Sequence, residues 1–207
     1  MLFYDVTSKC MLHEKEYLMK RKAMVAWRTL SRKTILEHNK FLTVEQHDIQ
    51  LPDGRVIQDW PWLITPDFVN VMAYSDDGLF HVFHQVKYAV QGTTLAPVGG
   101  HIEPGEEPFH AALRELREEM GYEAGEWIAL GSFKNNGNYG SGTAHLYLAC
   151  GVHKVCEPII DDLEEMELCT LTLEELEEEV VAGAFKAISW TTAAALTLLH
   201  LKRQHAR

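Results

Sequence analysis

Runs in which hydrophobic and polar residues alternate dominate the chain after residue 40, and they predict β-strands. The first four runs are joined in pairs by sequences rich in proline, aspartate and glycine, which favour turns, so they predict two β-hairpins. The first hairpin comprises residues 40–50 and 55–64 around PDG at 52–54, and the second comprises residues 67–74 and 79–86 around SDDG at 75–78. Further strands are expected at residues 127–133, 144–152 and 166–171.

A helical repeat of hydrophobic residues replaces this alternation in other segments. The clearest covers residues 108–120, with Pro108 suited to the first turn and Gly121 suited to the end of the helix. Two further helices are expected at residues 171–183 and 187–202, and a looser stripe predicts a helical arm at residues 11–33. Mixed strands with helices on the faces predict an α/β or α+β sandwich.

The composition changes this picture little. With 46% hydrophobic and 24% charged residues, it is typical of a soluble globular protein. No hydrophobic run approaches the roughly 18 residues of a membrane helix, and the N-terminus lacks the residue order of a signal peptide, so we expect a cytoplasmic protein without membrane contact. The four cysteines form no C-x-x-C pair, which argues against a zinc site.

The charge is distributed unevenly along the chain. The net charge of -11 argues against nucleic acid as a partner. Residues 1–40 nevertheless carry nine Lys or Arg against four acids, whereas residues 157–179 carry eleven acids and no Lys or Arg. The basic arm could bind an acidic surface or a polyphosphate. The favoured alternative is that both segments are solvated helix faces.

A cluster of glutamates is the strongest chemical signal. Glu115, Glu118 and Glu119 stand at i, i+3 and i+4 of the expected helix, which places them on one face. Like charges at this spacing destabilise a helix, so a cation is expected among them. A hard divalent cation with oxygen ligands is the natural candidate.

These residues resemble a known family. The positions that match the Nudix box are Gly100, Glu106, Arg114-Glu115-Leu116, Glu118-Glu119 and Gly121, and Tyr122 departs mildly from the aliphatic residue usual there. From about residue 40 to 200 the chain is similar to the ADP-ribose pyrophosphatase branch of that family. The resemblance implies a mixed β-sheet sandwiched between helices. We expect an N-terminal helical and β-hairpin arm at 1–63 and the Nudix hydrolase domain at 64–207.

The resemblance implies a site that binds Mg²⁺ or Mn²⁺. Glu115 and Glu119 would be the main ligands, Glu118 a further ligand, and the backbone carbonyl of Gly99 or Gly100 another. Arg114 would clamp a glutamate, and Glu106 would be an orienting carboxylate in the loop. The chemistry agrees, because metal ions neutralise a diphosphate, position its oxygens and acidify the attacking water.

The general base is expected outside the box. In the ADP-ribose branch it lies on a loop that follows the box, and here Glu164 in the segment 161–165 occupies that place. A carboxylate there could accept a proton from the attacking water. The alternative is a solvated acidic loop without a catalytic role.

Four residues are candidates for substrate binding. Phe41 and Trp60 stand where relatives stack the adenine, although core packing is the commoner role of strand aromatics. Lys87 stands where the branch usually has an arginine facing phosphate, and a lysine lacks the bidentate fork. Tyr139, in a region without the proline of relatives specific for ADP-ribose, could pack on a second base or lie in a plain hairpin loop. The turn 97–100 is one residue longer than usual.

The predicted function is metal-dependent hydrolysis of the diphosphate linkage of a nucleoside diphosphate derivative. ADP-ribose or another nucleotide sugar is the first expectation. The alternatives are a dinucleoside polyphosphate or capped-RNA pyrophosphohydrolase and, lower in rank, a non-catalytic nucleotide-sensing regulator. The resemblance also implies a homodimer in which the hairpin at residues 41–63 reaches the partner's pocket.

Overall fold

The computed structural model describes residues 24–159 and 165–205. The chain divides into two compact units. One contains the described residues up to Ile35 together with Glu45–Pro61, and the other contains Leu36–Val44 and the described residues from Trp62 onward. Among the helices of the described ranges, none is long and apolar enough to cross a membrane.

A three-stranded sheet forms the first part of the described chain. Its strands, in the order β1-β2-β3, are β1 (Arg28–His38), β2 (Leu42–Gln50) and β3 (Val56–Ile64). The turn between β2 and β3 is closed by a 2.8 Å hydrogen bond from the Leu51 N–H to the Arg55 carbonyl. Gly54 has φ of 89° in this turn, a conformation that favours glycine. The first predicted hairpin is therefore confirmed.

The helix expected at residues 11–33 is wrong in its last part. Residues 28–33 belong to β1, whereas residues 11–23 lie outside the described residues. The β-branched side chains of Thr34 and Ile35 favour an extended chain, and pairing with β2 provides hydrogen bonds between strands. These effects outweigh the loose hydrophobic stripe on which the helix prediction depends.

The second unit is built on a mixed β-sheet. Its strands are β4 (Phe68–Tyr74), β5 (Phe80–Val86), β6 (Thr93–Ala96), β8 (Glu126–Lys134), β9 (Thr143–Cys150) and β11 (Met166–Leu171). Neighbours follow the order β11-β5-β4-β9-β8, with β6 also paired to β5. The β4–β9 pair is parallel and the other pairs are antiparallel. All of these strands except β6 are predicted from the sequence.

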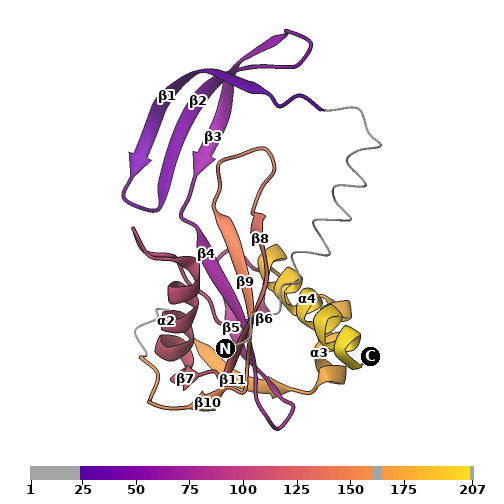
Figure 1. The fold of residues 1–207 in the computed structure, drawn as a ribbon. Coiled ribbons are helices and arrows are strands. Elements are labelled where there is room, and N and C mark those ends of the chain that lie inside the picture. Colours follow the sequence, from indigo (N-terminus) through magenta and orange to yellow (C-terminus); the bar gives the residue numbers. More distant parts are fainter. Residues whose placement is uncertain (1–23, 160–164, 206–207) are drawn as a thin grey trace. The chain divides into compact units, whose positions relative to one another are not determined.

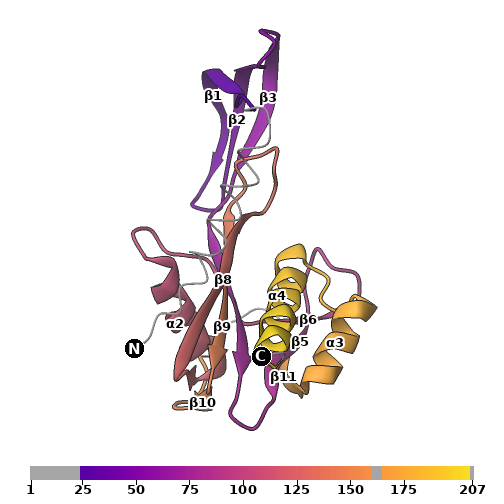
Figure 2. The same cartoon turned by 45° about the vertical axis from the view of Figure 1, so that its right-hand side comes forward.

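Helices cover both faces of this sheet, as Figures 1 and 2 show. The helix α2 (Pro108–Met120) packs on one face, and α3 (Leu173–Ala182) and α4 (Ile188–His205) pack on the other. A hydrophobic core lies on each face of the sheet, and β4 contributes residues to both. Val69 and Val71 pack with Leu116 of α2, and Met72 packs with Leu198 of α4. The predicted sandwich of a mixed sheet between helices is confirmed.

Both ends of α2 follow the sequence signals. Pro108 lies in its first turn, and Gly121 ends it in the left-handed conformation with φ of 72°. The Gly121 carbonyl accepts hydrogen bonds from the N–H groups of Val155 and Cys156, at 2.8 and 3.1 Å. Next to it, β7 (Tyr122–Glu123) pairs with β10 (His153–Lys154), a two-stranded sheet that the sequence does not predict. The end of α2 is thus tied to a segment more than thirty residues later in the chain.

A separation between β4 and β5 makes room for the site. These strands are paired only at Ala73–His81 and Tyr74–Phe80. The chain that leaves β6 then pairs with β4, because Val71 donates to the Val98 carbonyl at 2.8 Å. Farther along, Val69 donates to the Gly100 carbonyl at 2.9 Å. This inserted segment brings the glycines of the box under α2.

Candidate active site

The inserted segment has glycine at two crowded positions. A Cβ atom on Gly100 would come closer than 3.0 Å to the carboxylate of Glu115. A Cβ atom on Gly99 would come equally close to the Asn70 side chain and the Val69 carbonyl. Real Cβ atoms essentially never approach so closely, so the glycine at position 100 allows the Glu115 carboxylate to lie directly against the backbone.

Arg114 connects three glutamates into one cluster. Its guanidinium donates to both oxygens of Glu106, at 2.9 and 3.0 Å, in a bidentate pair. It also donates to Glu115 at 2.7 Å and to Glu118 at 2.9 Å. A fifth bond of 3.1 Å reaches the backbone carbonyl of His101. One side chain therefore holds the glutamates of α2, the loop that carries Glu106, and the inserted segment.

The electrostatics of this cluster are unequal. Burial raises the pKa of Glu115, an effect that its hydrogen bond from Arg114 opposes. Hydrogen bonds from Arg114 lower the pKa of Glu106. The same pairs, that with Glu106 foremost, raise the pKa of the Arg114 guanidinium. An added positive charge nearby would therefore favour the ionised form of Glu115.

Glu119 faces the glycine segment by a different contact. One of its carboxylate oxygens accepts a 3.1 Å hydrogen bond from the Gly99 N–H. Glu115 and Glu119, one turn apart on α2, therefore lie against two adjacent glycines, Glu115 against Gly100 and Glu119 against Gly99. In contrast, Glu118 is bound by Arg114 and has a side chain that is 41% exposed.

The donor groups suit a hard divalent cation. Within the described part of the chain, no three His, Cys, Asp or Glu side chains are already arranged as a metal-ligating group. The positive charge among the glutamates comes instead from the Arg114 guanidinium. Glutamate oxygens and backbone carbonyls are nevertheless the ligands that Mg²⁺ and Mn²⁺ prefer. The absence of a side chain at Gly100 leaves the space into which Glu115 projects. The residues present therefore fit such an ion.

The acidic segment begins beside α2. The Ile159 N–H donates a 2.7 Å hydrogen bond to the Glu118 carbonyl, which places the start of this segment next to the glutamate cluster. The chain is described again at Glu165, before Met166 pairs with Gln85 of β5. Glu164, the predicted general base, lies outside the described residues.

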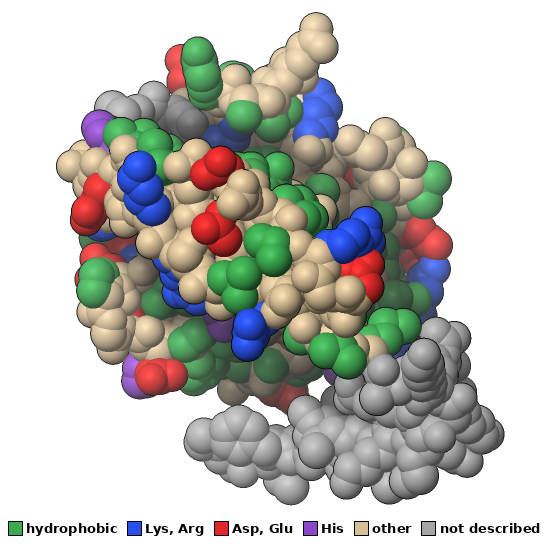
Figure 3. Space-filling view, turned by 90° about the horizontal axis from the view of Figure 1, so that it is seen from above, with side chains coloured by type: hydrophobic (Ala, Val, Ile, Leu, Met, Phe, Trp, Pro, Cys, Tyr) green, Lys and Arg blue, Asp and Glu red, His purple; other side chains and the backbone are tan. Residues whose placement is uncertain are grey.

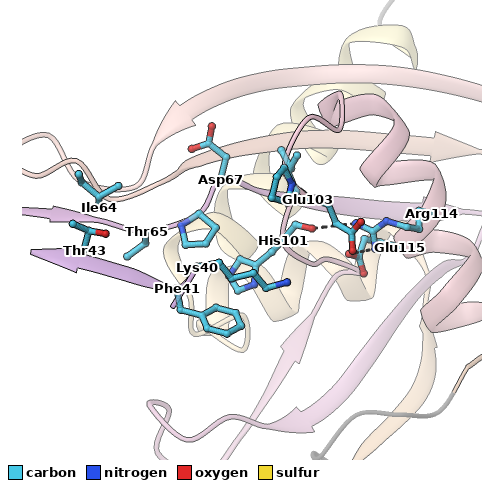
Figure 4. Close-up of a pocket in the computed structure, with 13 residues that line it drawn as sticks. Lys40, Phe41, Thr43, Ile64, Thr65, Asp67, His101, Glu103, Arg114 and Glu115 are labelled. Atoms are coloured by element: carbon cyan, nitrogen blue, oxygen red, sulfur yellow. Dashed lines mark hydrogen bonds and ion pairs between the residues drawn. The ribbon is translucent and has the colours of Figure 1, made fainter. Parts of the chain in front are cut away.

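A cavity of about 510 Å³ opens beside the cluster (Figure 4). All of its lining residues belong to the second unit. They are Lys40, Phe41, Thr43, Ile64, Thr65, Pro66, Asp67, His101, Ile102, Glu103, Pro104, Arg114 and Glu115. The rings of Phe41 and His101 lie 5.9 Å apart, and burial, together with the charge of Lys40, lowers the pKa of His101.

The predicted substrate residues are distributed over both units. Phe41 lines the cavity. Trp60 belongs to the first unit, where its ring meets Trp27 edge-on at 5.8 Å between centroids. Lys87 directly follows β5, and Tyr139 lies in the loop after β8. The strand directions therefore place both residues at the end of the sheet where β4 begins. Neither of these two lines the cavity.

Sequence reasoning missed the part of the cavity wall around Thr65 and Asp67, and the contacts by which a glycine-rich loop supports it. Gly142 donates to the Thr65 hydroxyl at 2.9 Å, and the next residue, Thr143, donates to Asp67 at 2.6 Å. A Cβ atom on Gly140 would overlap the Trp62 indole. The dense glycines of residues 137–142 were the available signal, because glycine is frequent where a backbone approaches another group closely.

Comparison with known proteins agrees with this architecture. The NUDIX domain model matches residues 65–191, which is more than half of the chain. The model for the nucleoside diphosphate sugar hydrolase N-terminal domain matches residues 27–63. The chain therefore belongs to the Nudix family and is a Nudix hydrolase. Hydrolases of this family generally use divalent metal ions.

Individual relatives place the chain near the ADP-ribose pyrophosphatases. It is 29% identical to the ADP-ribose pyrophosphatase of Bacillus subtilis (strain 168), over 72% of this chain and 82% of that protein. Over a shorter region, 21% of this chain and 29% of the relative, it is 46% identical to the bis(5'-nucleosyl)-tetraphosphatase [asymmetrical] of Rattus norvegicus. A solved structure described as an ADP compounds hydrolase has the same fold, with a TM-score of 0.73, 21% identity, and coverage of 89% of this chain and 98% of that one.

Proposed function

We propose that this protein hydrolyses the diphosphate linkage of a nucleoside diphosphate derivative, with ADP-ribose or another nucleotide sugar as the substrate and Mg²⁺ or Mn²⁺ as the cofactor. The observation that carries the proposal is the glutamate cluster of α2, held against Gly99 and Gly100 beside the cavity. The similarity to ADP-ribose pyrophosphatase over most of both chains supports the substrate class.

The metal ligands in this proposal are Glu115 and Glu119, with Glu118 as a further ligand. The Gly100 carbonyl already accepts a hydrogen bond from Val69, so the Gly99 carbonyl is the better backbone ligand of the two. When bound, the ions would neutralise the diphosphate and acidify the attacking water. The chain's own residues hold the glutamates in place and admit the substrate through the cavity.

Arg114 and Glu106 are positioning residues in this proposal. Their bidentate pair joins α2 to the loop in front of it, and the bond from Arg114 to the His101 carbonyl joins α2 to the inserted segment. Glutamates held at a fixed geometry bind metal without reorganising at the moment of reaction.

Glu164 remains the proposed general base. Support comes from the hydrogen bond between Ile159 and the Glu118 carbonyl, which places Ile159, shortly before Glu164 in the chain, next to α2. If Glu164 accepts the proton, Glu164→Gln will lower kcat and remove the acidic limb of the pH–rate profile. An unchanged profile would exclude it.

The glycine at position 100 provides a direct test of the site geometry. Gly100→Ala is expected to lower turnover by about 10²-fold, since displacing a ligand by about 1 Å can cost this much. The added methyl group must push the Glu115 carboxylate away. Gly137→Ala is the matched control, because a Cβ atom there meets nothing within 4 Å. Normal turnover of Gly100→Ala, measured alongside its thermal melt, would contradict the assignment.

Three residues of the second unit contact the substrate in this proposal. Phe41 would stack on the base from the cavity wall, and Lys87 and Tyr139 would act from the end of the sheet where β4 begins. Stacking by Trp60, which belongs to the first unit, stays a separate prediction from the sequence. Loss of nucleotide affinity in Phe41→Ala with retention of affinity for ribose 5-phosphate would support stacking. Equal losses for both ligands would contradict it.

A panel of substrates tests the function itself. Formation of the cleaved nucleotide products from ADP-ribose, a nucleotide sugar, a diadenosine polyphosphate and a capped RNA would be measured with and without Mg²⁺ and Mn²⁺, because hydrolysis of the linkage places a phosphate group on each product and releases no inorganic phosphate. Metal-dependent turnover of the first two is expected. Preference for the diadenosine compound would favour the second candidate, which the match to the tetraphosphatase supports. Binding without turnover of any of them would indicate a sensor.

The remaining parts of the proposal concern the surroundings of the protein. A homodimer is expected, and sedimentation as a monomer at micromolar concentration would contradict it.

Nucleic acid is not expected as a general partner, since the net charge is -11 and acidic and basic side chains intermingle on the face shown in Figure 3. A cytoplasmic location is proposed, and recovery of the protein in an exported fraction would contradict it.

A further inference from the structure

We propose that Lys40 binds the phosphate oxygens of the substrate from the cavity side, opposite the glutamates that hold the metal. The inference rests on the proposed function, because it names the residue by which that site recognises a nucleoside diphosphate. Lys40 lies in the turn between β1 and β2, outside the Nudix box and next to Phe41.

The charges that line the cavity point to this residue. Two cationic side chains, Arg114 and Lys40, are among the lining residues. The guanidinium of Arg114 is already bonded to Glu106, Glu115 and Glu118. Across the described ranges, by contrast, no carboxylate forms an ion pair with Lys40. Its charge is therefore available to an anionic ligand, and a concave site strengthens that attraction.

The Phe41 ring restrains the ammonium group of Lys40. The Lys40 Nζ lies over the Phe41 ring, 5.5 Å from its centroid, and this ring in turn contacts His101. The His101 carbonyl accepts a hydrogen bond from Arg114. In Figure 4 the Lys40 side chain extends toward the side where Arg114 and Glu115 lie. An ammonium restrained in this way loses less conformational entropy when a phosphate binds.

The test compares Lys40→Met and Lys40→Arg with wild type in binding the diphosphate analogue α,β-methylene-ADP in the presence of Mg²⁺. Loss of one charge-assisted hydrogen bond is expected to weaken binding by Lys40→Met about tenfold. This deficit should shrink as the salt concentration rises, and Lys40→Arg should retain most of the affinity. Adenosine, which lacks phosphate, should bind the Met variant as it binds wild type.

Lys202→Met is the matched control, since Lys202 lies on α4, across the sheet from α2, and pairs with Glu177 of α3. Unchanged affinity of Lys40→Met for the analogue, or an equal loss for adenosine, would overturn the inference. In turnover assays the Lys40→Met enzyme should have a higher KM than wild type and the same kcat. Wild type could hydrolyse no nucleoside diphosphate derivative while its affinity for the analogue still depends on Lys40. That result would refute the proposed function and leave the contact between Lys40 and phosphate supported.

Discussion

Glu119→Gln is expected to lower turnover by about 10³-fold or more, because it removes one negative charge from the metal site while keeping the shape of the side chain. Glu119 is the glutamate whose carboxylate lies on the Gly99 N–H, and an amide oxygen can accept the same hydrogen bond. The fold should therefore be preserved. Turnover of the preferred substrate and the thermal melt would be measured on the same preparation.

The control for Glu119→Gln is Glu178→Gln on α3, an exposed glutamate of a helix on the opposite face of the sheet. It makes the same chemical change away from the site and should leave turnover unchanged. The variant should also need more Mg²⁺ for half-maximal activity, since a ligand has been lost. A fully active Glu119→Gln enzyme would refute the assignment of this glutamate to the metal.

Arg114→Met is expected to affect both stability and turnover. It leaves the carboxylates of Glu106, Glu115 and Glu118 close together without their shared cation. The loss of a partly buried ion-pair network predicts a decrease of about 2–3 kcal/mol in the free energy of unfolding, after allowance for the exposed fraction of its side chains. Chemical denaturation in the absence of metal would measure this decrease.

Added Mg²⁺ should restore part of that stability, because an ion that binds the folded glutamates stabilises the native state and replaces some of the missing charge. Arg114→Lys should be intermediate, since a lysine keeps the charge and loses the bidentate pair with Glu106. Arg117→Met, which removes an exposed ion pair with Glu123, is the control and should change little. Equal stability of Arg114→Met and wild type without metal would contradict the role given to Arg114.

Local spacing explains why the helical half of the site is predictable. Glu115, Glu118 and Glu119 lie within two turns of one helix, so their common face follows from the helical repeat alone. The start at Pro108 and the end at Gly121 are likewise local backbone properties, and both agree with the structure.

Contacts between distant segments explain what was not predicted. The strand β1 replaces part of an expected helix because its partner, β2, supplies the hydrogen bonds. The short strand β6 exists because β4 and β5 separate, which no single-strand pattern indicates. The pairing of β7 with β10 likewise depends on residues about thirty positions apart.

The sequence by itself determined the common face of the glutamates, because their spacing follows the helical repeat. The hydrophobic patterns of successive segments indicated a sheet with helices, and the reaction class followed from the resemblance to the Nudix box. The tertiary structure alone decided what surrounds that cluster. It placed Gly100 against Glu115, gave Arg114 three carboxylate partners, and brought Lys40 to the cavity. Such neighbours are selected by packing and strand pairing across the whole domain, and the periodicity of one segment carries no information about them.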